Sequence, residues 1–360
     1  MVYYSRMIRV SLNNEILKRL LAIERYNERF GGVRLPVVIS NKLRKSSRKK
    51  SSYASVKIEG NPLTEEQASE AIDSSRRHYL KPEQEVRNYY QALEFLEGAR
   101  KRKTPFSKEL ILKTQALVVR GESEEKVGLR GPMPPGVLFA VYDDVTRQPE
   151  YVPPQASELE GLLDELVAYA NESDDHPLVK AGIIHYQLVT IHPFEDGNGR
   201  TARLMSDYFL DLNGHGFNQI GSLEEYFAYD IDEYYRSLQM GLPADYYSGR
   251  ADPPHPEIWI GYFLRMVELH AKRAVELVQL PERERLNPAL SHLGRREREF
   301  YEYLCRRQIE TFRPIDLKGK FKVTNRTIIN WAAALVKQGL LKPDIEGQRI
   351  RSYSRIGGRK

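Results

Sequence analysis

The sequence predicts a mainly α-helical protein with one β-hairpin near its middle and a small α+β domain at its C-terminus. Over most of the chain, apolar residues recur at the spacing of amphipathic helices. This pattern breaks at 127–154, where a β-rich apolar run, a polar turn and a second extended run predict a hairpin. The charge balance also changes along the chain, which sets the last part apart from the rest.

Length, composition and charge define the broad class of the protein. With 360 residues, 41% of them apolar and 29% charged, the chain is expected to form two or three globular units. Residues 289–360 hold 17 Lys and Arg against 7 Asp and Glu, whereas the remainder is slightly acidic. A basic tail on an acidic body favours a separate partner for the last part of the chain, and nucleic acid is one candidate.

Nothing in the sequence points to a membrane or to an oxidising compartment. No apolar run reaches the roughly 18–20 residues that a membrane helix needs, and the N-terminus lacks the layout of a signal peptide. The single cysteine, Cys305, excludes an internal disulfide. We therefore expect a cytoplasmic protein without a membrane partner.

Composition divides the chain into four parts. They are a helical N-terminal region at 1–100, a central domain at 101–280, a linker at 281–294 and a C-terminal domain at 295–360. Within the central domain, the hairpin is placed at 137–154. The polar, basic stretch 40–53 is interpreted as a solvated helix face or loop rather than a phosphate site.

Capping signals and apolar periodicity place the helices. The region Ser11–Asn14, Thr64 and Ser107 are the expected helix starts, and Gln67 completes a capping box with Thr64. Further helices are predicted over 82–100, 155–172, 177–191, Arg200–Leu212 and Trp259–Leu280.

The segment 192–200, HPFEDGNGR, joins two of these helices. Pro193 cannot lie inside a helix, and Gly197 and Gly199 allow the backbone to turn. The Gly-Asn-Gly turn is therefore expected at a helix N-terminus. Unpaired N–H groups and the helix dipole make such a turn an anion site.

Side chains in and after this turn suit a polyphosphate. Arg200 and Arg203 project from the first helical turn on nearby faces, and two guanidinium forks favour several phosphates over one. Asp196 offers a hard oxygen ligand for Mg²⁺. His192 is placed to act as a general base for a hydroxyl, and Phe194 is the expected buried anchor of the loop.

The twelve residues HPFEDGNGRTAR at 192–203 resemble the signature of the Fic (filamentation induced by cAMP) family, His-x-Phe-x-(Asp/Glu)-Gly-Asn-Gly-Arg-x-x-Arg, at every defined position. The resemblance extends over roughly 35–275. It implies a helical Fic core in which the hairpin at 137–154 is the flap that docks the target. It also implies ATP as substrate, Mg²⁺ as cofactor, and transfer of AMP to a Ser, Thr or Tyr hydroxyl of a target protein.

The resemblance further implies a role for each matched residue. His192 would deprotonate the hydroxyl and Asp196 would hold the metal. Attack at the α-phosphorus would release pyrophosphate. The residues implied to bind phosphates are Gly197, Asn198 and Gly199 for the α- and β-phosphates, and Arg200 and Arg203 for the distal ones, Arg203 chiefly for the γ-phosphate.

A second motif lies upstream at 55–61. Ser55, Glu59 and Gly60 match the family's inhibitory pattern (Ser/Thr)-x-x-x-Glu-(Gly/Asn). A carboxylate at the end of a helix would pair with Arg203 and occupy the space that the γ-phosphate needs. The alternative is a helix that ends at Gly60 with an exposed Glu59. We expect the protein to be largely self-inhibited.

The adenine pocket is less defined. The run EYYRSLQ at 233–239 resembles the Tyr-Tyr-x-x-Leu helix of the family, so Tyr234 and Tyr235 would flank the base. Some relatives carry an Asn seven residues after the second Tyr, where this chain has Leu242. Discrimination of ATP from other nucleotides is therefore expected to be loose. The alternative is that both tyrosines belong to the edge of the core.

The stretch 310–353 predicts a helix, a turn, a second helix and a two-stranded ribbon, and resembles a winged helix-turn-helix. Thr324 is the expected cap of the second helix. Exposed residues of this helix would meet a DNA groove, namely Asn325, Arg326, Thr327 and Asn330. A protein-docking or dimerisation module is the other interpretation, and the sequence leaves both open.

Three functions compete at this stage. The first is a Mg²⁺-dependent protein adenylyltransferase, and removal of AMP by the same site stays open. The second is a DNA-binding regulator whose Fic core senses nucleotide without turnover, which intact His192 and Asp196 argue against. The third transfers another phosphate-containing group, as in relatives with Lys at the second Gly of the nest, but Gly199 favours AMP transfer.

Overall fold

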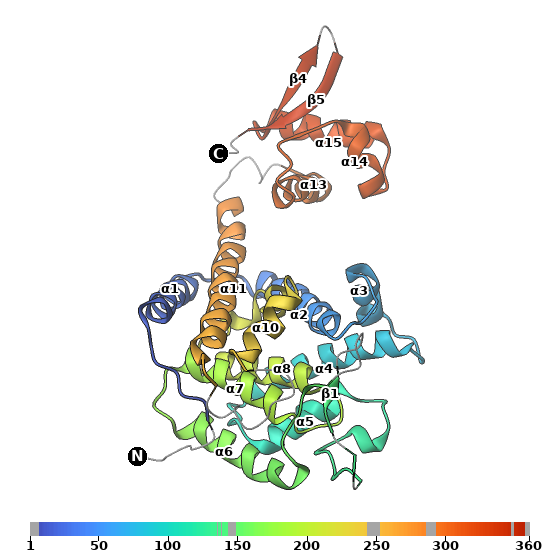
Figure 1. The fold of residues 1–360 in the computed structure, drawn as a ribbon. Helices are drawn as coiled ribbons and strands as arrows, with labels where there is room; N and C mark the ends of the chain where they lie inside the picture. The colour runs from blue at the N-terminus through green and yellow to red at the C-terminus, as the bar shows by residue number, and fades with distance from the viewer. Residues whose placement is uncertain are drawn as a thin grey trace. The chain divides into compact units, whose positions relative to one another are not determined.

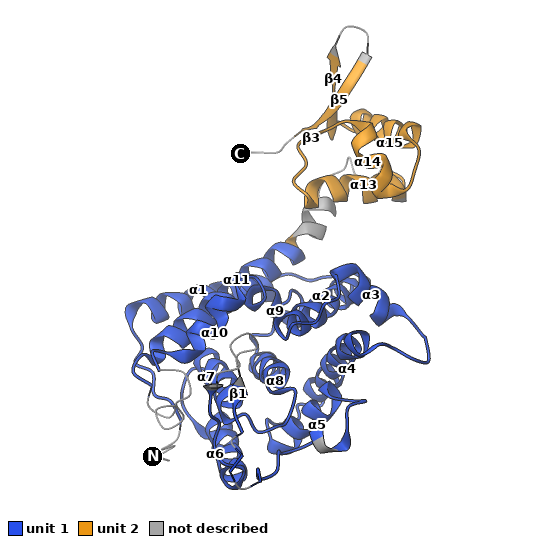
Figure 2. Ribbon diagram, turned by 45° about the vertical axis from the view of Figure 1, so that its right-hand side comes forward, with its two compact units in different colours: residues 1–278 blue, residues 279–360 orange. Residues whose placement is uncertain are grey.

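A computed structural model of the chain describes residues 7–134, 136–137, 139–142, 149–242, 253–285, 293–346 and 349–356. The chain divides into two compact units, Met1–Val278 and Gln279–Lys360 (Figure 2). The structure places the regions predicted at 1–100 and 101–280 together in the first unit. The N-terminal region is therefore part of the same compact body as the signature segment.

Helices make up the first unit apart from one short hairpin (Figure 1). Its elements in chain order are α1 Asn14–Gly31, α2 Val37–Ile58, α3 Glu65–Asp73, α4 Lys81–Lys101, α5 Lys108–Val118, η1 Glu124–Lys126, β1 Val141–Tyr142, β2 Pro149–Tyr151, η2 Ala156–Glu158, α6 Leu159–Glu172, α7 Pro177–Ile191, α8 Asn198–Leu212, η3 Phe217–Gln219, α9 Glu224–Phe227, α10 Ile231–Gln239 and α11 Pro256–Arg285. No helix of the part described is long and apolar enough to cross a membrane.

The predicted helix starts are confirmed by their hydrogen bonds. Asn13 caps α1, Ser107 caps α5, and Thr64 and Gln67 form the capping box of α3. Each cap needs only residues within one helical turn, so the sequence alone identifies it.

The pair α7 and α8 forms the centre of the first unit. The apolar face predicted for α7 understates its burial, because the helix is enclosed along nearly its whole circumference. Gly182 shows how closely α11 approaches, since a Cβ atom there would lie 2.9 Å from Ile260 Cδ1. Trp259 of α11 donates a hydrogen bond of 2.7 Å to the Gly182 carbonyl.

The basic stretch 40–53 is helical and belongs to α2, but only part of its surface faces solvent. Ser47, Ser51 and Ser55 recur at intervals of four and form its buried stripe. The charged residues beside this stripe make ion pairs with other helices, such as that between Arg48 and Glu94. A short side chain every turn allows α2 to pack closely while its long cations reach outward.

The hairpin is present where the sequence predicts it. Strands β1 and β2 pair antiparallel, with Val141 opposite Tyr151. The turn at 143–148 lies outside the described residues. At the other predicted boundary, α11 continues through Pro281 to Arg285, so the first part of the expected linker at 281–294 is helical.

The second unit has its own core, formed by three helices and a three-stranded sheet. Its elements are α13 Arg295–Arg306, β3 Thr311–Phe312, α14 Pro314–Phe321, α15 Asn325–Lys337, β4 Leu341–Glu346 and β5 Arg349–Arg355. The strand order is β3-β5-β4, with antiparallel pairing throughout. Thr324 caps α15 as predicted, accepting a hydrogen bond from the Thr327 N–H.

Candidate active site

The loop between α7 and α8 (192–199, the signature loop) is held in an unusual backbone conformation. His192 ends α7 in the left-handed region, with φ 48° and ψ 57°. Gly197 precedes α8 with φ 82°, where an L side chain is strained and where a Cβ would lie 3.1 Å from Val118 Cγ1. Phe194 is buried, as predicted for the anchor of the loop.

Asn198 closes the loop with its own side chain. Its Nδ2 donates to the Phe194 carbonyl at 2.8 Å, and its Oδ1 accepts from the Phe194 N–H at 3.0 Å. Both ends of the amide are therefore used within the loop. A phosphate would meet the backbone N–H of Asn198 rather than its side chain.

The opening turn of α8 leaves backbone donors free for an anion. Thr201 is the first residue whose N–H makes a helical bond, to the Gly197 carbonyl at 2.8 Å. Within the described part of the chain, the N–H groups of Asn198, Gly199 and Arg200 make no backbone hydrogen bond. Three N–H groups at a helix N-terminus are thus available to an anion, in the place where the sequence predicts one.

The His192 imidazole is held in one tautomer by a backbone contact. Its Nδ1 lies 3.2 Å from the Val189 carbonyl oxygen. Because a carbonyl oxygen only accepts, Nδ1 carries the proton and Nε2 keeps its lone pair. Burial lowers the pKa of His192 to about 4, so the half-buried imidazole is uncharged near neutral pH.

Asp196 lies among cations. Its Oδ1 accepts from Arg200 Nη2 at 2.6 Å, and its Oδ2 lies 3.5 Å from Lys126 Nζ. No group of three or more His, Cys, Asp or Glu suited to a metal occurs among the residues described. A single carboxylate still fits Mg²⁺, which completes its shell with phosphate oxygens and water.

Arg203 is the most buried charge of the site, with only 1% of its surface exposed. Its Nε donates to Ser55 Oγ at 2.8 Å, and its Nη2 donates to Glu59 Oε1 at 2.6 Å. Its Nη1 has no hydrogen-bond partner among the described residues. A buried guanidinium nitrogen without a partner is costly, so Nη1 is a vacant donor for an anion.

Glu59 reaches into the opening turn of α8. A Cβ built on Gly199 would lie 2.6 Å from Glu59 Oε1 and 3.2 Å from Arg203 Nη1. The carboxylate of Glu59, which directly follows α2, therefore lies over the Gly-Asn-Gly turn. It sits close to both groups that an anion at the helix N-terminus would contact.

The two tyrosines of α10 have different surroundings. Tyr234 is 1% exposed, and its hydroxyl lies 2.9 Å from His185 Nε2 inside an aromatic cluster. Tyr235 is 47% exposed. Tyr234 therefore belongs to the core, as in the alternative interpretation, and has no free face for an adenine base. Tyr235 is accessible to an adenine base.

Arg130 connects the signature loop to the chain beside the hairpin, and sequence reasoning missed it. Its N–H and Nε donate to the carbonyls of Pro193 and His192, both at 2.9 Å, and its Nη2 donates to Pro154. The guanidinium also lies 4.4 Å from the Phe139 ring centroid. In the sequence, only its position in GLRGPMPPG before the hairpin indicates a structural role for Arg130.

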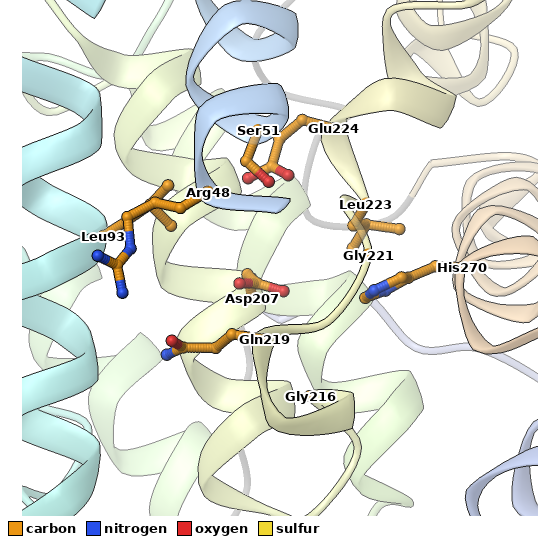
Figure 3. Close-up of a pocket in the computed structure, with 10 residues that line it drawn as sticks. All are labelled: Arg48, Ser51, Leu93, Asp207, Gly216, Gln219, Gly221, Leu223, Glu224 and His270. Carbon is orange, nitrogen blue, oxygen red and sulfur yellow. The ribbon is translucent and has the colours of Figure 1, made fainter. Parts of the chain in front are cut away.

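A separate small pocket lies between α2, α4, α8 and α11 (Figure 3). Asp207 and Glu224 face it, and burial together with Glu224 raises the pKa of Asp207 well above its usual range. Its volume of about 20 Å³ is close to that of one water molecule. An acidic pocket of this size does not suit a nucleotide.

His270 on the edge of this pocket predicts acid sensitivity of the first unit. Burial lowers its pKa to about 4, whereas the unfolded chain has the ordinary value of about 6.5. The unfolded state therefore binds a proton first as pH falls, and stability present above pH 6.5 is lost toward pH 4. This one group is expected to cost about 2 kcal/mol between pH 7 and pH 5.

The measurement compares urea unfolding at both pH values. His270→Gln should reduce the loss by about that amount, because glutamine keeps a donor but takes up no proton. His255→Gln, at a residue with a side chain 58% exposed, is the control and should leave the loss unchanged. Equal losses of unfolding free energy in the wild type and both variants would show that His270 does not cause the acid sensitivity.

Comparison with known proteins agrees with the site. The family model for the Fic/DOC family matches residues 105–210. A protein adenylyltransferase Fic of Aedes aegypti is 40% identical over 68 residues, which is 18% of this chain and 14% of that protein. One from Nematostella vectensis is 42% identical over 64 residues, 17% of this chain and 15% of that protein. The match thus spans about one seventh of the length of these relatives.

Solved structures share the fold over a longer part of the chain. A Fic family protein from Desulfovibrio desulfuricans G20 aligns with a TM-score of 0.61 at 21% identity, over 98% of both chains. Fic-1 (residues 134–508) from C. elegans aligns with a TM-score of 0.57 at 22% identity, over 74% of this chain and 73% of that one. Residues 105–210, which contain the signature loop and the opening turn of α8, therefore match the Fic/DOC family model and form a Fic domain.

Proposed function

We propose that this chain transfers AMP from ATP to a Ser, Thr or Tyr hydroxyl of a target protein. The observation that carries the proposal is the vacant, buried Nη1 of Arg203 beside the free N–H groups of α8, with the Nε2 lone pair of His192 in the same loop. Donors for a polyphosphate and a base for a hydroxyl then lie within one short segment. The names of the relatives, protein adenylyltransferase Fic, agree with this chemistry.

In the proposed reaction the target oxygen attacks the α-phosphorus of ATP. The new oxygen–phosphorus bond forms as the bond to the bridging oxygen of pyrophosphate breaks, and the hydroxyl proton passes to Nε2 of His192. The N–H groups of Gly199 and its neighbours hold the α- and β-phosphates, and Arg203 holds the γ-phosphate. Alignment and neutralisation of charge supply most of the catalysis.

Asp196 is the proposed holder of Mg²⁺. When bound, the ion would neutralise phosphate charge and stabilise the leaving pyrophosphate. Asp196 would exchange its contact with Arg200 for the metal, which frees that guanidinium for a distal phosphate. The single carboxylate oxygen donor fits a metal that keeps water and phosphate ligands.

We further propose that Glu59 inhibits this reaction from within the chain. Its carboxylate occupies the place over Gly199 and uses the Arg203 Nη2 donor that the γ-phosphate needs. ATP would then bind without its third phosphate in the productive position. Displacement of the end of α2 would be required for turnover.

The proposal extends to the base, the target and the reverse reaction. Tyr235 contacts the base and the hairpin β1–β2 docks the target. The site also permits removal of AMP from modified targets, and we expect the protein in the cytoplasm. The orientation of His192 argues against a nucleotide sensor without turnover, because sensing alone needs no base with a free lone pair.

The test uses ATP labelled on either its α- or its γ-phosphate, with the Glu59→Gly form and purified protein as acceptor. Protein-bound label is expected from α-labelled ATP alone. Label from the γ-phosphate would show a kinase-like orientation, and label from neither, with ATP bound, would support the sensor.

A further inference from the structure

The second unit has one strongly basic surface that AMP transfer does not use. From Leu317 to Pro343 the chain holds six Lys and Arg and no Asp or Glu. All six side chains are exposed, and no ion pair is found for any of them among the described residues; they are Lys318, Lys320, Lys322, Arg326, Lys337 and Lys342. We call this set the basic face.

Two other cations of the unit are paired with carboxylates. Arg306 of α13 lies 3.8 Å from Glu302, and Arg313 makes two hydrogen bonds to the carboxylate of Asp316. Asp344 interacts electrostatically with Lys342, and none of the other five cations has an ion pair among the described residues. Clustered cations with so few counter-charges repel one another, and an anionic partner would relieve that repulsion.

Helix α15 presents one exposed ridge within this surface. At about 100° per residue, the exposed positions fall within roughly 140° of arc, and they are Asn325, Arg326, Ile329, Asn330, Ala333 and Lys337. The opposite side is buried and consists of Ile328, Ala332 and Leu335. The ridge carries Arg and Asn, whose side chains can bind base edges, and a small Ala at its middle.

The elements around α15 match a helix-turn-helix with a wing. Lys322 turns the chain between α14 and α15 with φ 53°, and the strands β4 and β5 follow α15 as a hairpin. Lys342 lies at the start of this hairpin. Of the residues predicted to meet a groove, Asn325, Arg326 and Asn330 are exposed, whereas Thr327 is half-buried.

Two carboxylates near the basic face are engaged within the unit. Asp344 accepts from the hydroxyls of Ser352 and Ser354, at 2.9 and 2.6 Å. Asp316 pairs with Arg313. Neither is therefore positioned as a free charge against an anionic partner.

We propose that the second unit binds duplex DNA, with the ridge of α15 in the major groove and the basic face on the phosphates. The competing partner is a protein. In its favour, Ile345 and Ile350 are a cross-strand pair, 63% and 50% exposed, at the far part of β4–β5. The acid-free stretch favours DNA, because protein interfaces are depleted in Lys whereas phosphate contacts require it.

The test measures the binding of the full chain to a fluorescent duplex of random sequence, about 25 base pairs long, by anisotropy at several KCl concentrations. Wild-type affinity is expected to fall linearly with salt on a double-logarithmic scale. Arg326→Glu with Lys337→Glu should weaken binding at least about tenfold and reduce the salt slope by about two.

The control carries the same change of charge on the first unit, Lys101→Glu with Lys113→Glu, whose side chains are 62% and 60% exposed. It should bind DNA like the wild type. Arg326→Ala with Lys337→Ala tests whether misfolding explains the weaker binding. Its DNA affinity should lie between those of the wild type and the double Glu variant, and its unfolding midpoint should equal that of the wild type.

Three results would overturn the proposal. The first is no DNA binding at low salt up to about 100 μM protein, where even weak non-specific binding is detectable. The second is equal DNA affinity of the Arg326 and Lys337 variants and the control. The third is self-association through the basic face that these substitutions abolish, while DNA does not bind. None of these bears on AMP transfer, which is measured separately.

Discussion

Glu59→Gly is expected to raise transfer of AMP onto the protein itself by about 10- to 100-fold. The substitution removes a charge-assisted hydrogen bond of about 1.5–3 kcal/mol that competes with the phosphate for Arg203, and each 1.4 kcal/mol is about tenfold. It also clears the space over Gly199, which the Glu59 carboxylate now occupies. The measurement is protein-bound label from α-labelled ATP, followed in time.

Glu59→Gln is the matched comparison. The amide has the size of the carboxylate but not its charge, so it should release inhibition only in part. Because Glu59→Gly leaves the buried Arg203 with fewer partners, the unfolding midpoint must be measured alongside. Equal automodification by wild type and Glu59→Gly, with both folded and binding ATP, would show that Glu59 does not inhibit.

His192→Ala is expected to reduce AMP transfer by about 10²- to 10⁴-fold, the range that general-base catalysis supplies. The variant is best made in the Glu59→Gly chain, where the starting rate is high enough to measure the loss. ATP affinity should change little, because the phosphate donors belong to the backbone of α8 and to Arg200 and Arg203. The readouts are the rate of label incorporation and the dissociation constant of ATP.

His255→Ala serves as the control, since the His255 side chain is 58% exposed and His255 directly precedes α11, away from the signature loop. It should keep the full rate. If His192→Ala transfers AMP at a rate within about tenfold of the Glu59→Gly chain, another group accepts the hydroxyl proton, because a positioned base contributes more than tenfold. Loss of both ATP binding and transfer would instead indicate that the loop had collapsed.

Local patterns determined which elements form and where the phosphate-binding turn lies. Thr64 and Gln67 are three residues apart, so their capping box is legible in the sequence. The same holds for the signature loop, because Pro193 ends one helix and Gly197 allows the turn that starts the next. The motif also suggested the partner of Glu59, although 144 residues separate it from Arg203.

Only the tertiary structure decided what surrounds these residues. The distance between Glu59 and Arg203 depends on how α2 packs against α8, and the missing partner of Nη1 depends on every element around it. Tyr234 looked like one of an equivalent pair, yet packing buries it while Tyr235 stays exposed. Arg130 holds the signature loop by donating to the carbonyls of His192, Pro193 and Pro154. No sequence spacing predicts these contacts. Caps and turns are fixed by neighbours within about one helical turn, whereas burial and vacant hydrogen bonds are properties of the assembled core.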